Sequence, residues 1–189
     1  MNTHKKPKKQ FNQKKKLGLV HVYTGDGKGK TTAALGLMMR ALGHDYRVLM
    51  VRFLRGYKDT GEIKALSKIK GEIEILPFAS EEPIDLLNPT PTDYHLAEQA
   101  MAYVRRIMVE KRPDLLVLDE INPAVHHGLI DIKDIIDFLD HRHQQTEIVL
   151  TGRDAHPELL NYADLVTVMH CSKDYFNHAL FETRFGIEH

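Results

Sequence analysis

Residues 24–32 read Thr24-Gly25-Asp26-Gly27-Lys28-Gly29-Lys30-Thr31-Thr32 and join two apolar stretches, residues 19–23 and residues 33–42. Three glycines within five positions allow the backbone to turn through positive φ and to approach a ligand without Cβ clashes. Successive N–H groups can then converge on phosphate oxygens, with the positive end of a helix dipole behind them. The pattern predicts a phosphate-binding loop between a strand and a helix that begins near Lys30.

Two residues of this loop fit separate parts of a magnesium polyphosphate. Lys30 can reach phosphate oxygens as a point charge, and the hydroxyl of Thr31 can ligate a magnesium ion that bridges them. The common form of the loop is G-x-x-x-x-G-K-[ST], and here Thr24 occupies the first glycine position. The alternative is an ordinary glycine- and lysine-rich surface turn, which the flanking strand and helix signals disfavour.

A second candidate for the same site follows the apolar run at residues 115–118, where Asp119 and Glu120 stand together. An apolar run without alternation is typical of a parallel strand that is covered on both faces. In phosphate-loop enzymes, an acid at the end of such a strand holds magnesium directly or through water. The acids could instead begin a solvated loop, but together with the phosphate loop they predict metal ligands alongside Thr31.

Length and composition are those of an ordinary globular protein, with 189 residues, 42% of them hydrophobic and 28% charged. No run approaches the roughly 20 apolar residues that span a bilayer, and the lysine-rich N-terminus lacks the apolar core of a secretory signal. We therefore expect a cytoplasmic protein without membrane insertion. The single cysteine, Cys171, excludes an internal disulfide and a cysteine-clustered zinc site.

Charge is distributed unevenly along the chain. Residues 1–16 hold seven of the 26 basic residues and no acid, so residues 17–189 carry 19 basic and 26 acidic side chains. The sequence predicts a basic, disordered arm at residues 1–16, followed by one nucleotide-binding domain at residues 17–189. The arm could contact nucleic acid, a membrane surface or an acidic partner. A solubilising tail is favoured, and nucleic acid is not the expected partner, because a lysine run without aromatic residues has no base-stacking chemistry.

Strand and helix signals alternate along the remaining chain. Expected strands lie at residues 47–53, 72–76, 115–120, 147–150 and 165–169, and expected helices lie at residues 61–70, at residues 92–111 and after the N-cap Asp131. This alternation predicts a mainly parallel sheet with helices on both faces, an α/β fold of the phosphate-loop NTPase (RecA-like) type. Because ligands bind at the carboxyl ends of such strands, the phosphate loop, residues 52–56, Asp119 with Glu120, and residues 151–153 can share one edge.

Seven segments occur in order along the chain: YTGDGKGKTTAA (23–34), RALGH (40–44), FLRG (53–56), VLDE (117–120), LTGR (150–153), ADLV (163–166) and GIE (186–188). Together they resemble the corrinoid adenosyltransferases, ATP-dependent enzymes that attach a 5′-deoxyadenosyl group to the cobalt of cobalamin precursors. The loop that lacks its first glycine is the most diagnostic of these segments. The resemblance implies that cobalt(I) attacks the 5′ carbon of ATP and that triphosphate is expelled.

The resemblance also implies roles for individual residues. Lys30 and Arg153 would be the catalytic groups that stabilise the departing triphosphate, and Thr31, Asp119 and Glu120 would hold Mg²⁺. The nucleotide and corrinoid would be bound by a larger set: Gly25, Asp26, Gly27, Lys28, Gly29, Lys30, Thr31, Thr32, Arg40, Arg153, Phe53 and Phe78. Phe53 and Phe78 are the corrinoid-side candidates, and core packing is the alternative for both. The chain has no tryptophan.

Expected partners follow from the same resemblance. They are ATP and a corrinoid, a reductase or flavodoxin as electron donor, and a second copy in a homodimer. Two other classes of function stay open at this point. One is a different phosphate-loop enzyme, a small-molecule kinase or NTPase, and the other is a nucleotide or corrinoid binder without catalysis that uses its basic arm.

Overall fold

The computed structural model describes residues 17–54, 56, 60–80, 84–175, 184 and 186–187. The expected basic arm at residues 1–16 lies outside these residues. The described strands are β1 (Val20–Thr24), β2 (Val48–Arg52), β3 (Ile73–Pro77), β4 (Leu115–Asp119), β5 (Glu147–Thr151) and β6 (Leu165–Val168). The described helices are α1 (Lys30–Leu42), α2 (Gly61–Leu66), α3 (Pro91–Glu110), α4 (Ile121–His126), α5 (Ile132–His141) and α6 (Pro157–Tyr162).

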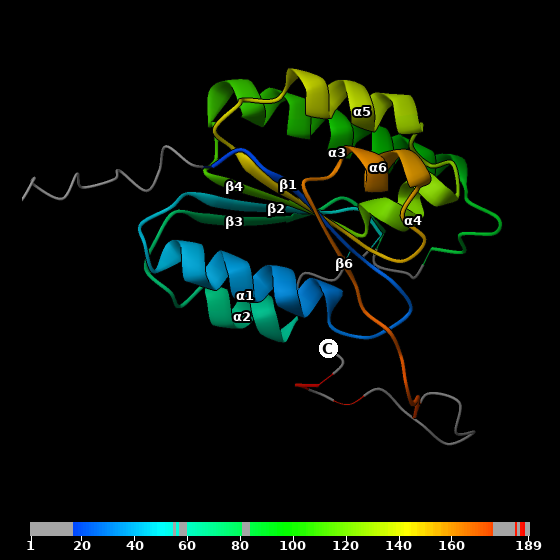
Figure 1. Ribbon diagram of the computed structural model, residues 1–189, viewed down its shortest axis with the longest axis horizontal. Coiled ribbons are helices and arrows are strands. Elements are labelled where there is room, and N and C mark those ends of the chain that lie inside the picture. Colours follow the sequence, from blue (N-terminus) through cyan, green and yellow to red (C-terminus); the bar gives the residue numbers. More distant parts are fainter. Residues whose placement is uncertain are drawn as a thin grey trace, which may run out of the picture.

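The strands form one sheet in the order β3-β2-β4-β5-β1-β6, and every described pair of neighbours is parallel. Helices α1 and α2 cover one face of this sheet, and α3, α4, α5 and α6 cover the other (Figure 1). The α/β fold with a parallel sheet that the sequence predicts is therefore confirmed. Since all strands run the same way, their carboxyl ends meet at one edge.

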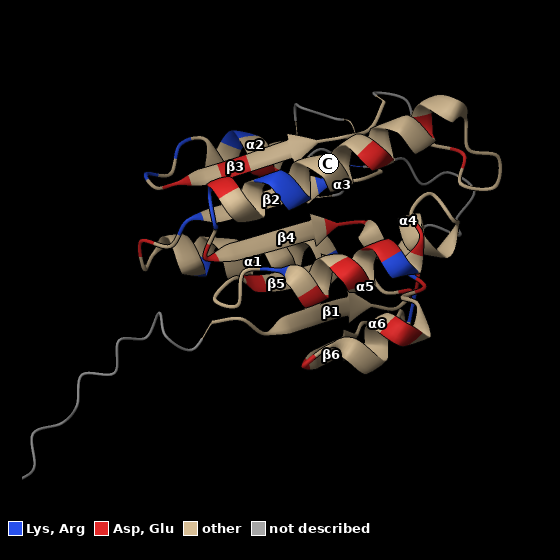
Figure 2. Cartoon of the chain, turned by 90° about the horizontal axis from the view of Figure 1, so that it is seen from above, with Lys and Arg blue, Asp and Glu red and all other residues tan. Residues whose placement is uncertain are grey.

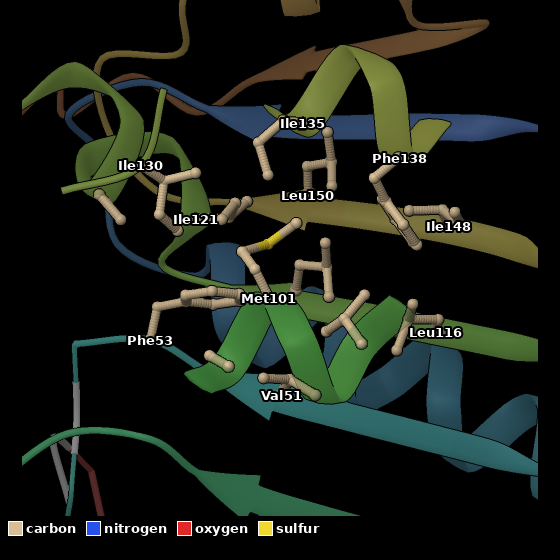
Figure 3. Close-up of a cluster of buried hydrophobic side chains, with 14 of the residues drawn as sticks. Val51, Phe53, Met101, Leu116, Ile121, Ile130, Ile135, Phe138, Ile148 and Leu150 are labelled. Atoms are coloured by element: carbon tan, nitrogen blue, oxygen red, sulfur yellow. The ribbon is translucent and has the colours of Figure 1, made fainter. Parts of the chain in front are cut away.

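The core consists of apolar layers on the two faces of the sheet. All five residues of β2 and all five of β4 are buried, as an unbroken apolar run predicts for central parallel strands. On the α3–α5 face, Met101 lies among apolar side chains from the strands and from α5 (Figure 3). A smaller cluster, which includes Met38 of α1 and Val117 of β4, lies on the other face.

Local signals account for the ends of the long helices. Thr90 caps α3 in a capping box with Asp93, and Pro91 occupies the first turn. The expected N-cap of α5 is confirmed, because the side chain of Asp131 accepts a hydrogen bond from the backbone N–H of Lys133. None of the helices in the described part of the chain combines the length and apolar composition that crossing a bilayer requires.

Helices α4 and α6 were not among the expected elements. Each has only six residues, which is fewer than two turns, so neither builds an apolar stripe that periodicity could detect. Both matter for the site, since α4 follows β4 directly and α6 lies between β5 and β6. In Figure 2 the carboxyl end of β4 is red, where Asp119 and Glu120 lead into α4.

Candidate nucleotide and metal site

The phosphate loop connects β1 to α1 and depends on glycine at defined positions. Gly25 and Gly29 have φ values of +98° and +118°, a region that favours glycine. A Cβ atom on Gly25 would lie 2.4 Å from the carbonyl oxygen of Met169. The backbone N–H of Gly27 donates to that same oxygen over 2.8 Å. The glycines therefore serve the packing of the segment after β6 as well as the approach of a ligand.

Lys30 begins α1 and folds back over the loop. Its Nζ donates to the carbonyl oxygens of Gly25 and Gly27 over 2.6 and 2.7 Å, and the residue is 8% exposed. The first N–H groups of a helix have no acceptor within the helix, so this end of α1 favours an anion. The lysine charge and the helix end thus lie together at the place where the sequence predicts phosphate.

Asp119 is the buried centre of the site, with no exposed surface. Its Oδ1 accepts hydrogen bonds from the hydroxyls of Thr31 and Thr151 over 2.8 and 2.7 Å. Its Oδ2 has no hydrogen-bond partner among the described residues and lies 3.6 Å from Nε of Arg52. One carboxylate therefore links the start of α1, the end of β5 and the end of β2.

Glu120 follows Asp119 in a left-handed backbone conformation with φ +61° and occupies the N-cap position of α4 without a capping hydrogen bond from its side chain. Its backbone N–H donates to the hydroxyl of Thr151 over 3.0 Å. Thr151 therefore uses one hydroxyl to contact both acids, as donor to Asp119 and as acceptor from the Glu120 backbone.

Arg153 reaches the phosphate loop from the end of β5. Its Nη2 donates to the carbonyl oxygen of Asp26 over 3.2 Å. The side chain of Asn122 supports this turn, since its Nδ2 donates to the carbonyl oxygen of Gly152 over 3.1 Å. The pKa of Asp26 is lowered, first by the hydrogen bond from the backbone N–H of Cys171. Residues from β1, β5 and the segment after β6 thus meet at one edge of the sheet.

A cavity of about 430 Å³ lies beside the loop. This volume is within the range of small-molecule sites, about 300–1,000 Å³. Polar and apolar groups both line it, including Thr24, Asp26, Arg153, Leu160 and Val168. The edge that carries the phosphate loop therefore has room for a ligand larger than phosphate.

The sequence also predicts Arg40, Lys28 and Thr32 for cofactor binding. Arg40 is exposed in the last turn of α1, about 15 Å along the helix from Lys30 at 1.5 Å per residue. Lys28 Nζ donates to the carbonyl oxygen of Ile187 over 2.9 Å, and Thr32 is exposed in the first turn of α1. The roles of these three residues in cofactor binding stay predictions.

The two corrinoid-side candidates lie on the α3 face of the sheet. Phe53 is 1% exposed and belongs to the core cluster (Figure 3). Phe78 is partly buried against that cluster, with its ring centroid 5.4 Å from that of Tyr103. Both rings pack against the core in this structure. Contact with a corrinoid stays a prediction, and Phe78 is the better candidate because it is the more accessible of the two.

Three further residues at the site were not given roles by the sequence. Arg52, Thr151 and Asn122 are 2%, 0% and 0% exposed, and each contacts a predicted site residue or the loop beside it. An arginine at the end of an apolar strand is a signal that could have drawn attention to Arg52, because lone buried charges are costly. Thr151 belongs to residues 151–153, which the sequence places at this edge without a role for the threonine itself, and nothing comparable marks Asn122.

The parallel sheet, the glycine loop, Lys30 at the helix start and the buried Asp119 on a neighbouring strand define a nucleotide-binding protein of the phosphate-loop class. Solved structures agree on the fold. The flagellar accessory protein FlaH from Methanocaldococcus jannaschii has a TM-score of 0.52 at 15% identity, covering 80% of this chain and 71% of its own. The KaiC-like protein PH0186 from Pyrococcus horikoshii also has a TM-score of 0.52 at 15% identity, covering 84% and 75%.

Within this class, the chain belongs to the ATP:corrinoid adenosyltransferase family BtuR/CobO/CobP, whose family model matches residues 16–189. A corrinoid adenosyltransferase of Sinorhizobium sp is 33% identical over 172 residues, which are 90% of this chain and 80% of the relative. The corrinoid adenosyltransferases of Escherichia coli K12 and Salmonella typhimurium are each 30% identical, covering 91% of this chain and 86% of the relative. The family that the sequence resembles is therefore confirmed.

Proposed function

We propose that this chain transfers the 5′-deoxyadenosyl group of ATP to the cobalt(I) of a corrinoid substrate and releases triphosphate. One observation carries the proposal. In a chain of this family, the hydroxyl of Thr31 meets the buried carboxylate of Asp119 over 2.8 Å directly beside the phosphate loop. This arrangement provides a place for a charged polyphosphate and for the cation that accompanies it.

The reaction requires the protein to position the two substrates and to stabilise the negative charge of the leaving triphosphate. A bond forms between cobalt and C5′ of the ribose while the bond from C5′ to the triphosphate oxygen breaks, and that oxygen takes the electron pair. The nucleophile carries no proton, so the chain needs no general base. Lys30 and Arg153 are the groups that would stabilise the leaving triphosphate, since both lie at the loop.

The residues at the loop fit Mg²⁺. Oxygen donors suit this ion, and it is usually bound by one or two carboxylates together with substrate phosphates. Asp119 Oδ2 is buried without a hydrogen-bond partner among the described residues, and Thr31 Oγ1 lies on the other side of the same carboxylate. Thr31 and Asp119 would hold the ion, with Glu120 beside them. When bound, Mg²⁺ would add positive charge where triphosphate departs.

Partners beyond the two substrates also belong to the proposal. A homodimer is supported by β6, an edge strand whose four residues are all exposed, among them Leu165, Val166 and Val168. A reductase or flavodoxin would supply the electron that converts cobalt(II) to the nucleophilic cobalt(I). Phe78 would approach the corrinoid from the end of β3.

The proposal is tested by mixing the protein with Mg-ATP and a chemically reduced corrinoid and recording the absorbance spectrum. We expect the spectrum of a cobalt–carbon product to develop only when all three components are present. A phosphorylated acceptor, or steady ATP hydrolysis without corrinoid, would instead identify a kinase or NTPase of the same fold.

A further inference from the structure

Arg52 lies at the carboxyl end of β2 and is only 2% exposed. It lies between two carboxylates. Its Nε is 3.6 Å from Oδ2 of Asp119, and its Nη2 is 3.6 Å from Oε1 of Glu62 in the first turn of α2. Its Nη1 also donates to the hydroxyl of Thr60, the N-cap residue of α2, over 3.5 Å. One buried guanidinium therefore connects the centre of the site to the start of a helix.

Arg52 contacts Oδ2 of Asp119, the carboxylate oxygen to which neither threonine hydroxyl donates. Thr31 and Thr151 both donate to Oδ1, whereas Oδ2 faces Arg52. A divalent cation bound at this carboxylate would bring two positive charges close to the guanidinium. At such short range, and away from bulk water, like charges repel strongly. Arg52 and the cation therefore both need the charge of Asp119.

Glu62 offers Arg52 a second partner on the opposite side. The side chain of this glutamate is 28% exposed, so it stays partly solvated even when Arg52 is directed elsewhere. Neither ion pair is at hydrogen-bond length in the structure, since both distances are 3.6 Å. The guanidinium thus lies within ion-pair range of both acids at once.

We propose that Arg52 is a positioning residue that Asp119 and Glu62 share, so that the cation at Asp119 competes with Arg52 while Glu62 draws Arg52 away. This inference rests on the proposed magnesium role of Asp119. It makes the affinity for Mg²⁺ depend on an ion pair at the start of α2. Glu62 assists cation binding only through Arg52, because Arg52 lies between Glu62 and Asp119.

The test measures the dissociation constant of Mg²⁺ by calorimetry with saturating ATP and no corrinoid, at about pH 8.5, where carboxylic acids are ionised. Arg52→Gln should tighten Mg²⁺ binding on the order of tenfold, because it removes the competing charge. Glu62→Gln should weaken it roughly threefold, because Arg52 then turns fully to Asp119. In the double variant R52Q/E62Q the effect of Glu62 should vanish, which a double-mutant cycle measures directly.

Two further variants complete the experiment. Arg52→Lys keeps the charge and should retain an affinity near that of the parent protein. Arg105→Gln removes an exposed arginine that pairs with Asp137 over 2.7 Å, and it should leave Mg²⁺ binding unchanged. If R52Q does not fold, E62Q alone still tests the proposal. An unchanged or tighter Mg²⁺ affinity in E62Q overturns it.

Other outcomes are equally decisive. Weaker or unchanged Mg²⁺ binding in R52Q, or an effect of E62Q that persists in the double variant, contradicts a shared guanidinium. A parent protein that binds no ATP at any Mg²⁺ concentration would instead contradict the proposed function on which the inference rests.

Discussion

The hydroxyl of Thr31 donates a hydrogen bond to Oδ1 of Asp119 over 2.8 Å, across a sequence separation of 88 residues. This contact joins the first turn of α1 to the end of β4, the two elements that phosphate-loop proteins use to hold a nucleotide and its cation. Thr151 reaches the same oxygen from β5. Hydroxyls from α1 and β5 thus fix the carboxylate at the end of β4, and a ligand would meet a site that is already ordered.

Replacing Lys30 tests the phosphate loop. Lys30→Met keeps much of the apolar stem and removes the charge, so turnover should fall by at least about 100-fold, as expected for loss of a transition-state charge partner. ATP affinity should fall as well. Lys133→Met removes an exposed lysine of α5 and should change neither quantity. Unaltered turnover in a folded K30M protein would contradict the assigned site.

Two glycines of the same region should respond oppositely to alanine. At Gly25 the added Cβ would lie 2.4 Å from the carbonyl oxygen of Met169 at a φ of +98°, so Gly25→Ala should lower the free energy of unfolding by more than about 1 kcal/mol. At Gly36, inside α1, no atom lies within 4 Å of the added Cβ. Gly36→Ala should raise the free energy of unfolding by about 0.5–1 kcal/mol. Denaturant titrations measure both changes, and equal effects would contradict the packing of the loop against the segment after β6.

The hydroxyl of Thr151 should matter for both stability and metal binding. Thr151→Val removes one of the two hydroxyl hydrogen bonds to Oδ1 of Asp119 and the hydrogen bond that the backbone N–H of Glu120 donates to Thr151, and it should destabilise the fold by about 1–3 kcal/mol. It should also weaken Mg²⁺ binding in the ATP complex. Thr146→Val is the matched control, because Thr146 is equally buried and its hydroxyl donates to the carbonyl oxygen of Pro113 over 2.7 Å.

That control should lose stability without losing Mg²⁺ affinity. Calorimetry with saturating ATP gives the affinity, and chemical denaturation gives the stability. If both threonine variants changed Mg²⁺ affinity to the same extent, the hydroxyl of Thr151 would have no specific role at the metal site.

Glu147 makes the fold sensitive to acid at the other end of the sheet. Burial raises its pKa, but hydrogen bonds with His21 and with the backbone N–H groups of Gly18 and Leu19 outweigh burial and lower the pKa below the ordinary value of 4.5. A lowered folded-state pKa contributes stability above that ordinary value, and the contribution is lost as the pH falls through the folded-state pKa. Glu147→Gln should therefore cost about 1–3 kcal/mol at neutral pH.

The difference between the two proteins should shrink as the pH falls below about 4.5, because both then lack the charge. Urea denaturation at a series of pH values measures this difference in unfolding free energy. Glu110→Gln, at an exposed position that pairs with Arg106, should give no such difference. If the difference in unfolding free energy between E147Q and the parent protein stayed constant into strong acid, the lowered pKa of Glu147 would be contradicted.

Much of this architecture could be predicted because its signals are local. The buried strand β4 is an unbroken apolar run up to Asp119, and the loop of residues 24–32 has a composition that is typical of phosphate binding. The contacts between Arg52, Asp119 and Glu62 could not be predicted in the same way. They depend on the order of β2 and β4 in the sheet and on where α2 begins, and no short segment of sequence contains that information.

Arg40 is a candidate that only the family resemblance gives. Its sequence segment matches the family, yet the helix that carries Lys30 in its first turn places Arg40 in its last turn. Its role in cofactor binding therefore stays a prediction. Helices α4 and α6 were missed for another reason, since six residues do not reveal a helical period.

Adenosyl transfer and phosphoryl transfer break different bonds of ATP. Phosphorus NMR of the reaction with Mg-ATP and reduced corrinoid, combined with quantification of the adenosylated product, tests this directly. We predict one intact triphosphate for each cobalt–carbon bond formed. Production of ADP and phosphate in place of triphosphate would contradict adenosyl transfer by this protein.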